Sequence, residues 1–403
     1  MQIILFILII AVLTFLLIKK VNLQFVFILG SFLFVILFKR NVSLFIDVLL
    51  ITLRNSKTWQ LIGAVLLMLL FNDILRKTER LQLLIDSLKE LSKSVKLISA
   101  IIPALVGFLP MLGGAIISAP LVEEVLDNCD VTNEKKTLIN YWYRHVWEYT
   151  LPLYPGIILT SGLLNINFST LILYNIPLTL LAISAGVLFL FDLKRKNPKT
   201  FSKKSKKRIF LNLFIGLSPI LAVIIGVTIF KINIIIVLAI VITALLILFK
   251  DYIPEIHRDF DYKKYLSMLV LVFGLMLFKD SFIESGAVNI LPEYLISNNV
   301  PNIIIIALIP LVAGLMTGIT HAAVGISFPI IMPFLFPETG INMGSVVLAF
   351  MAGFAGVLLS PVHVCLAITK DYFKADSKKL YKLLFPAVLI MLAGAFSLYF
   401  LYQ

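Results

Sequence analysis

Long apolar runs separated by short charged segments dominate this sequence. Roughly eight or more of these runs are long enough to cross a hydrocarbon layer of about 30 Å at 1.5 Å per residue. Apolar and polar residues do not alternate within the runs, as they would in the strands of a membrane β-barrel. The pattern therefore predicts an all-α, polytopic membrane protein.

The first half of the chain, residues 1–192, is predicted to contain five crossings and one hairpin. In order, its segments are scaffold spans in 1–75, a surface helix in 76–96, a hairpin in 97–126, a broken span in 138–164 and a span in 168–191. Asn41–Arg54 is short and amphipathic, and is either an interfacial helix or an extra span. Residues 76–96 alternate charge with Leu and Ile at helical spacing, which indicates a helix along the cytoplasmic surface.

Segment 97–126 is apolar but carries Gly and Pro at Gly107, Pro110, Gly113, Gly114 and Pro120. It is either one kinked span or a re-entrant hairpin of two half-helices of about 12 residues that turns at Pro110–Gly114. Lysines flank the segment on both sides. They favour the hairpin, because both of its ends then stay on the cytoplasmic side.

The second half, residues 209–403, follows a basic linker, residues 193–208, and repeats this arrangement. Its segments are scaffold spans in 209–278, a hairpin in 301–336, a broken span in 343–368 and a last span in 383–401. The hairpin is interrupted by Gly314, Gly318, Gly325, Pro329 and Pro333, and the broken span by Ser360-Pro361. The acidic loop Asp280–Asn299 holds no Lys or Arg, so this hairpin is expected to enter from the opposite face.

Composition agrees with the membrane class, since 60% of the residues are hydrophobic and only 14% are charged, with a mean hydropathy of +1.02. The net charge is +13, and the Lys and Arg residues that produce it lie in short loops. There they orient the membrane spans, so the charge does not indicate a nucleic-acid partner. We expect the protein to lie in the cytoplasmic membrane of a prokaryote, with the lipid bilayer as its partner. The first span is expected to be retained, because it lacks a basic n-region and a cleavage site. The loops expected on the cytoplasmic side are 76–96, 127–137, 194–208, 250–264 and 370–382, and those outside are 280–299 and 337–342.

Three sequence matches at nearly constant spacing relate the two halves. Ile117-Ser118-Ala119-Pro120 recurs as Ile326-Ser327-Phe328-Pro329, 209 residues later, and Pro152 has its counterpart at Pro361, again 209 later. Asp73 and Asp280, both at span ends and expected at the interface, match at an offset of 207. An odd number of crossings per half places the halves in opposite orientations. This is the inverted-repeat organisation of secondary transporters, which bind substrate near the midplane where broken helices meet.

The broken span of the first half carries unusual chemistry for a membrane segment. Leu138–Gly156 reads LINYWYRHVWEYTLPLYPG, and 3.6 residues per turn aligns Tyr141, Arg144, His145 and Glu148 on one helical face. One turn later Pro152 and Pro155-Gly156 are expected to break the helix. Ionisable groups in a membrane segment are costly unless they line an enclosed or watery site, so this stretch predicts one.

The hairpins GFLPMLGGAIISAP and GLMTGITHAAVGISFP, each followed by a Pro-broken span, resemble those of the ion-transporter superfamily of secondary transporters. Its branches include sodium/dicarboxylate symporters and arsenite and sodium/proton antiporters, and this chain is most similar to an uncharacterised prokaryotic integral-membrane family within it. The resemblance implies a homodimer with a static scaffold and a mobile transport domain that works as an elevator. The Ser-Asn-Thr hairpin tips typical of the dicarboxylate branch are replaced here by Gly113, Gly114, Thr317 and Thr320.

Helix N-termini at hairpin tips suit an oxyanion, and carbonyls and hydroxyls suit Na⁺. The residues expected to bind substrate are Gly113, Gly114, Ser118, Arg144, Thr317, Thr320, Ser327 and Pro361. Those expected to couple an ion or proton are Glu148, His145, His321 and His363, with Na⁺ near Gly113, Thr317 and Thr320. Three structural alternatives stay open: small residues for close helix packing, an Arg144 that pairs with Glu148 or snorkels to the interface, and an aromatic belt at Tyr141–Tyr149. Cys129 and Cys365 have neither disulfide nor metal spacing.

The sequence therefore predicts a secondary active transporter that moves a small organic anion of the carboxylate type, coupled to Na⁺ or H⁺. The alternative is a cation/proton antiporter without an organic substrate, in which Glu148 and the histidines carry the proton. An intramembrane enzyme is a distant alternative, since the sequence contains no H-E-x-x-H or G-x-S-x-G. The chain has no P-loop for ATP, and we expect no enzymatic activity and no cofactor beyond the coupling ion.

Overall fold

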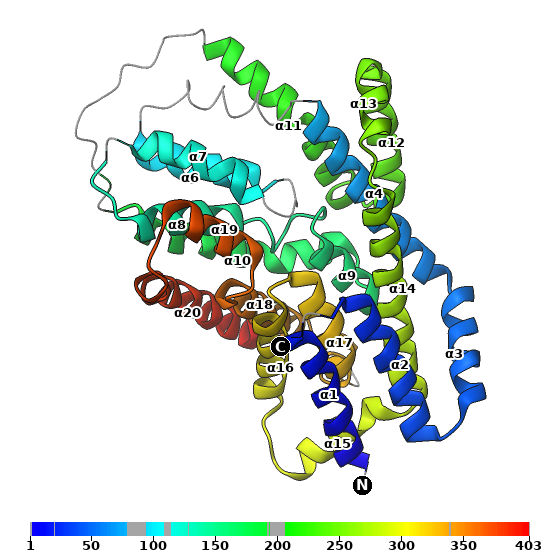
Figure 1. Cartoon of the computed structure of the whole chain (residues 1–403). Coiled ribbons are helices and arrows are strands. Elements are labelled where there is room, and N and C mark those ends of the chain that lie inside the picture. Colours follow the sequence, from blue (N-terminus) through cyan, green and yellow to red (C-terminus); the bar gives the residue numbers. More distant parts are fainter. Residues whose placement is uncertain are drawn as a thin grey trace.

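The computed structural model describes residues 2–19, 21–78, 94–108, 114–127, 129–191, 193, 206–337 and 340–402. The regular elements of these ranges are helices (Figure 1). Those of the first half are α1 (Gln2–Ile18), α2 (Leu23–Lys39), α3 (Val42–Arg54), α4 (Ser56–Lys77), α6 (Val95–Val106), α7 (Gly114–Leu126), α8 (Asn133–Arg144), α9 (Pro155–Leu164), α10 (Phe168–Gly186) and η1 (Val187–Phe189).

The second half also consists of long apolar helices joined by short connections. Its elements are α11 (Lys206–Thr228), α12 (Ile234–Leu248), η2 (Lys250–Tyr252), α13 (Ile253–Arg258), α14 (Tyr262–Glu284), α15 (Ala287–Ser297), α16 (Asn302–Thr317), α17 (Thr320–Leu335), α18 (Met343–Leu359), α19 (Val364–Phe373) and α20 (Ser377–Leu401). In the described part, 6 helical segments are long and apolar enough to cross a membrane, or up to 7 if the bent pair that starts with α12 is one span. The prediction of a multi-pass, all-helical membrane protein is confirmed at this level.

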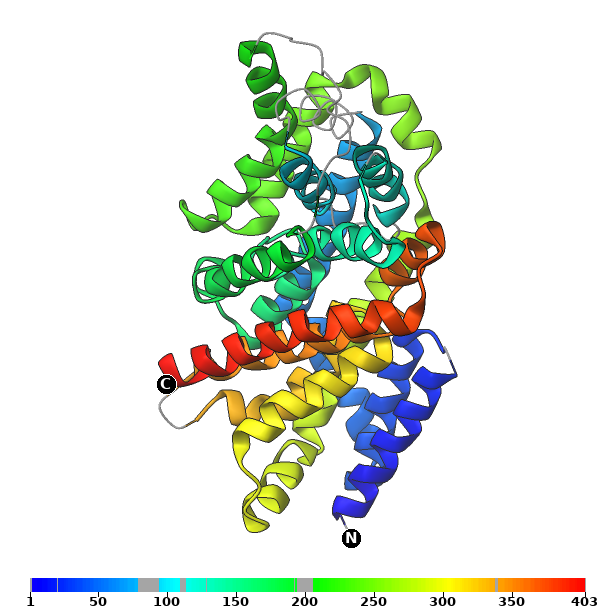
Figure 2. The same cartoon turned by 90° about the vertical axis from the view of Figure 1, so that its left-hand side faces the viewer.

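The helices form two groups (Figures 1 and 2). In the α14 group, α14 packs against α2, α3 and α4, and α12 packs against α4. In the α18 group, α18 packs against α16, α17 and α20, while α8 packs against α6, α7 and α19. Helices α4 and α9 meet where the two groups join. Segments from both halves of the sequence therefore contribute to each group.

Several predicted boundaries were wrong, and in each case a helix continues where the sequence suggested a loop or a break. Residues 250–264 and 280–299 were predicted as loops, but they contain α13 and α15. Gly314 lies inside α16, and Gly325, Pro329 and Pro333 lie inside α17, so the hairpin turns only at Gly318. Neighbouring helices tolerate such residues in a membrane protein because side chains and local adjustments satisfy the freed backbone groups. Most of the predicted surface helix, residues 79–93, and most of the basic linker lie outside the described residues.

Asp280, expected at the interface, is instead buried inside the α14 group with 8% of its surface exposed. Its carboxylate accepts a hydrogen bond from Thr52 Oγ1 at 2.8 Å, and Lys279 Nζ lies 3.6 Å away. Asp73 accepts hydrogen bonds from Lys264 and Tyr265. A buried carboxylate is stable only when hydrogen bonds and a charge compensate it, which ties α3 to α14.

We expect Thr52→Val to lower the stability of the fold by about 1–3 kcal/mol, because the isosteric change removes a hydrogen bond to a buried charged group. Thr58→Val is the matched control, since Thr58 is also fully buried and its hydroxyl has no hydrogen-bond partner among the described residues. Thermal unfolding of the purified protein in detergent measures both. Equal midpoints for the two variants would contradict the role given to Thr52.

Candidate functional site

The broken span of the first half ends its helix earlier than the sequence suggested. Helix α8 stops at Arg144 and α9 starts at Pro155, so Glu148 lies in the non-helical stretch and not on the face of a continuous helix. Successive turns replace the helix here, with His145 N–H donating to the Trp142 carbonyl and Glu148 N–H to the His145 carbonyl. Downstream, Pro152 and Pro155 have no N–H to give to the carbonyls of Glu148 and Leu151, so no regular helix forms again before α9.

The broken span of the second half behaves as predicted and lies against the tip of the second hairpin. Helix α18 ends at Leu359, and α19 starts at Val364. Ser360 Oγ donates to the Leu315 carbonyl at 2.7 Å. Gly318, at the tip, has φ +63, and a Cβ there would lie 2.9 Å from His363 N. The tip therefore needs glycine both for its left-handed backbone and for its close approach to the break.

Side chains from the two breaks and the hairpin tip meet in one buried set, called here the polar cluster. Its members are Arg144, His145, Glu148, Thr320, His363 and Cys365. Arg144 donates from one guanidinium nitrogen to Cys365 Sγ at 3.1 Å, and Thr320 Oγ1 donates to Glu148 Oε2 at 2.8 Å. The Nε2 atoms of His145 and His363 are 3.1 Å apart, and Glu148 Oε1 lies 3.7 Å from the same His145 nitrogen.

The polar cluster is enclosed by protein. Arg144 is 3% exposed, His145 2% and Glu148 7%, so Arg144 does not snorkel to an interface. The nearby aromatic residues do not form a belt at the membrane surface either, since Tyr141 and Tyr149 are fully buried within the α18 group. Ionisable groups buried in membrane-spanning segments mark sites of function far more often than sites of stability.

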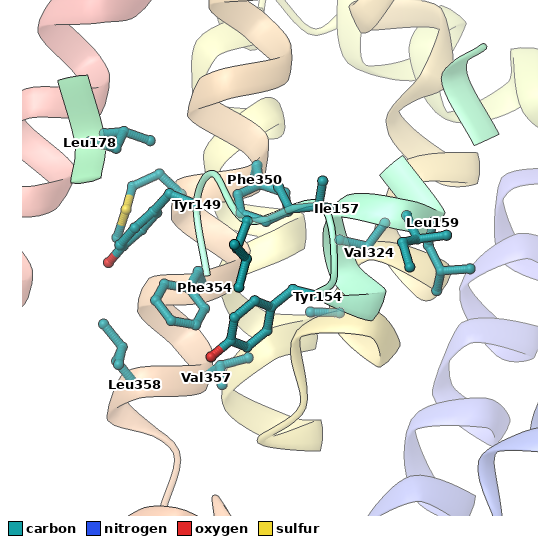
Figure 3. Close-up of a cluster of buried hydrophobic side chains, with 14 of the residues drawn as sticks. Tyr149, Tyr154, Ile157, Leu159, Leu178, Val324, Phe350, Phe354, Val357 and Leu358 are labelled. Atoms are coloured by element: carbon teal, nitrogen blue, oxygen red, sulfur yellow. The ribbon is translucent and has the colours of Figure 1, made fainter. Parts of the chain in front are cut away.

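Apolar packing holds the non-helical stretch in place against α18 (Figure 3). Tyr149 stands edge-on to Phe354, with ring centroids 5.0 Å apart. Tyr141 OH donates to the Leu358 carbonyl at 3.0 Å, and Tyr154 OH donates to the Gly107 carbonyl at 2.5 Å. These contacts connect the break of the first half to α18 and to the first hairpin. The backbone that carries Arg144, His145 and Glu148 is therefore fixed by tertiary contacts.

The N-termini of two helices face the polar cluster with different partners. Helix α17 begins at Thr320, whose hydroxyl contacts the Glu148 carboxylate. Helix α7 begins at Gly114, and a Cβ there would lie 2.4 Å from an Arg144 guanidinium nitrogen. The first pairing places a negative group at the positive end of a helix dipole, and the second places a positive group there. The α7 end is thus suited to an anion that contacts both Arg144 and the helix N-terminus.

Other residues predicted for the site lie apart from the polar cluster or are used within their own helices. Ser118 Oγ donates to the Gly114 carbonyl, Ser327 Oγ to the Ala323 carbonyl and Thr317 Oγ1 to the Ala313 carbonyl. These are hydrogen bonds to the preceding turn, as expected for hydroxyls packed in membrane helices. They agree with the structural interpretation of Ser118 and Ser327.

His321 and Pro361 also lie outside the polar cluster. His321 lines a small apolar cavity with Phe27, Pro155 and Met268, at the contact of the two helix groups. Pro361 is exposed at the break between α18 and α19. Gly113 lies outside the described residues. The structure therefore brings together Arg144, His145, Glu148, Thr320 and His363 from the predicted set, with Gly114 beside them.

A family profile described as "Protein of unknown function (DUF401)" matches residues 2–401. The chain belongs to the DUF401 family. No curated protein matches it. In this DUF401 protein the family match covers both helix groups and every member of the polar cluster. The family description gives no function for the residues of the polar cluster.

Sequence reasoning missed Cys365, because two cysteines far apart showed no metal spacing. In this structure its sulfur atom and one ring nitrogen each of His145 and His363 all lie within 4.8 Å of one another. The signal in the sequence was His363-Val-Cys365 directly after a Pro-containing break, opposite a His in the other broken span. Recognising it required knowing that the two breaks meet.

Proposed function

We propose that this protein is a secondary active transporter for a small organic anion of the carboxylate type, coupled to Na⁺ or H⁺. It works as a homodimer of inverted repeats, in which the α18 group moves as an elevator against the α14 group. The observation that carries the proposal is the buried Arg144 guanidinium beside the N-terminus of α7. A carboxylate bound there would accept hydrogen bonds from both the guanidinium and the N–H groups of the helix N-terminus.

The neighbouring N-terminus of α17 supports this assignment. Its anionic partner is a residue of the chain, Glu148, bonded to Thr320. The α7 N-terminus has Arg144 beside it, and a substrate carboxylate is the anion that we expect to bind between them. The arrangement also accounts for the two breaks, because unwound backbone in a membrane protein is tolerated where it is buried in protein or lines a cavity.

A second feature supports an anionic substrate. A cavity of about 400 Å³ lies between α4, α9 and α12, and it is lined by Lys57 and Lys231 together with Gln60, Asn165 and Asn233. Two lysines without an acidic residue among the residues that line this cavity create a positive potential, which raises the local concentration of anions. The cavity lies at the junction of the two helix groups, where a moving α18 group receives or releases substrate.

Uptake into liposomes tests the proposal. Purified protein is reconstituted, and a panel of radiolabelled mono- and dicarboxylates is offered under a Na⁺ gradient alone and then a proton gradient alone. We expect at least one carboxylate to accumulate under one of the two gradients, which identifies the coupling ion. Absence of uptake for the whole panel under both gradients, with protein correctly inserted, would contradict the organic-anion function.

A cation/proton antiporter is the second candidate, and a specific contact favours it. Glu148, His145 and His363 form a buried chain of titratable groups, with 3.7 Å and 3.1 Å between successive members. The same liposomes distinguish the two functions. If no anion moves but a Na⁺ gradient changes the internal pH, the antiporter is supported and Arg144 has a structural role.

A further inference from the structure

We propose that His145, His363 and Cys365 bind a single metal ion of the zinc type between the two broken spans. Imidazole nitrogen and thiolate sulfur are the donor types that Zn²⁺ takes in proteins. Their three ligand atoms lie within 4.8 Å of one another, and all three residues are buried. The proposal concerns binding of an ion and does not depend on the transport function.

The hydrogen bonds of the two histidines determine which ring nitrogen faces the site. His145 Nδ1 lies 2.5 Å from the Tyr141 carbonyl, and His363 Nδ1 lies 2.6 Å from the Gly318 carbonyl. A carbonyl only accepts, so each Nδ1 carries the hydrogen and each neutral ring presents the lone pair of Nε2. A backbone carbonyl that accepts from the opposite ring nitrogen is the usual support of a metal-binding histidine.

These two lone pairs point into the same small space. The Nε2 atoms are 3.1 Å apart in the protein interior, and two facing lone pairs repel unless a positive centre lies between them. For an ion at the usual Zn–N distance of about 2.0–2.1 Å from both nitrogens, the N–Zn–N angle would be roughly 100°, which is close to the tetrahedral angle. The spacing therefore suits one shared ion.

The charges around the pair also favour a cation. Arg144 donates to Cys365 Sγ at 3.1 Å, and a positive donor at that distance stabilises the thiolate, which is the form of cysteine that binds metal. Glu148 Oε1, 3.7 Å from His145 Nε2, places a carboxylate at the edge of the site. With the thiolate and Glu148 each carrying −1 and Arg144 +1, the neutral histidines leave a net charge of −1 for the ion to compensate.

The ion would connect the two halves of the chain. His145 follows α8, whereas His363 and Cys365 lie at the start of α19, 218 and 220 positions further along the chain. A metal at this point fixes the relative position of the two breaks within the α18 group. Its loss is expected to loosen the packing of α8 against α19.

The test uses full-length protein purified in detergent, stripped of metal by a chelator, and titrated with Zn²⁺ in competition with a chromogenic chelator. We expect one ion per chain. Cys365→Ser and His363→Asn should each weaken binding by about 100-fold or more, since loss of even an outer-shell partner typically costs 10–100-fold. Cys129→Ser and His257→Asn are matched controls, because they remove the same side chains outside the site, and they should bind as the wild type does.

A spectroscopic measurement keeps the proposal testable if a variant does not fold. Co²⁺ replaces Zn²⁺ in wild-type protein, and we expect a thiolate-to-cobalt charge-transfer band that persists in Cys129→Ser. Absence of the band in the wild type, or Zn²⁺ binding that is unchanged in correctly folded Cys365→Ser, would overturn the metal site. The 3.1 Å contact would then be a shared proton between two histidines.

Discussion

Arg144→Ala should abolish carboxylate uptake by reconstituted protein. The guanidinium is buried beside the N-terminus of α7, and truncating one partner of a buried, hydrogen-bonded charge pair costs about 2–5 kcal/mol. At 1.36 kcal/mol per factor of ten, even about 2 kcal/mol corresponds to roughly a 30-fold loss of substrate affinity. Uptake against a range of substrate concentrations measures the change.

Two further variants separate substrate binding from structure. Arg144→Lys keeps the charge but loses the planar fork that binds a carboxylate through two hydrogen bonds, so we expect measurable uptake with a raised half-saturation concentration. Arg258→Ala, at a side chain that is 73% exposed, is the control and should transport normally. If Arg144→Lys has the kinetics of the wild type, or if both Arg144 variants are misfolded, Arg144 is structural.

Gly356→Ala should strongly destabilise the α18 group. A Cβ on Gly356 would lie 2.1 Å from the Leu311 carbonyl oxygen and 2.6 Å from Leu315 N, both backbone atoms of α16. Backbone cannot rotate away, so α16 and α18 must separate. We expect a loss of about 1–3 kcal/mol, the usual cost of overpacking. We also expect Gly318 to move away from His363, because both helices end there. Thermal unfolding in detergent measures the loss.

Gly353→Ala, one turn earlier on α18, is the matched control for the same chemical change. A Cβ there would meet Pro310 Cβ at 3.4 Å, which is ordinary van der Waals contact. Alanine is also the better helix former, by about 0.8–1.0 kcal/mol in water, so this variant should be at least as stable as the wild type. A similar drop in unfolding temperature for both variants would show that the close approach of α16 and α18 is not the cause.

Most helices could be predicted from local patterns, because an apolar run in a membrane has few alternatives to helix. The second hairpin and the break at Ser360-Pro361 were located to within a few residues, since Gly and Pro act on their own backbone. The break after Arg144 was placed too late. Its position depends on contacts of Tyr141 and Tyr154 with distant segments.

Only some residues of the candidate site could be predicted from the sequence. Arg144 and Glu148 stood out because ionisable residues are rare in membrane segments. Ser118, Ser327 and Thr317 were equally plausible from the sequence, but their hydroxyls bond to their own helices. Whether a hydroxyl faces a site or the preceding turn depends on its rotamer and its neighbours.

By itself, the sequence determined that this is a multi-pass helical membrane protein, that its apolar segments are interrupted near Gly318 and Ser360-Pro361, and which charged residues lie within those segments. These properties follow from the length of apolar runs and from the backbone chemistry of Gly and Pro. Only the tertiary structure decided that His145 meets His363 and Cys365, that Thr320 bonds Glu148, and that Arg144 lies at the start of α7. Such contacts join residues that are distant in the chain, and helix packing alone sets which of them come together.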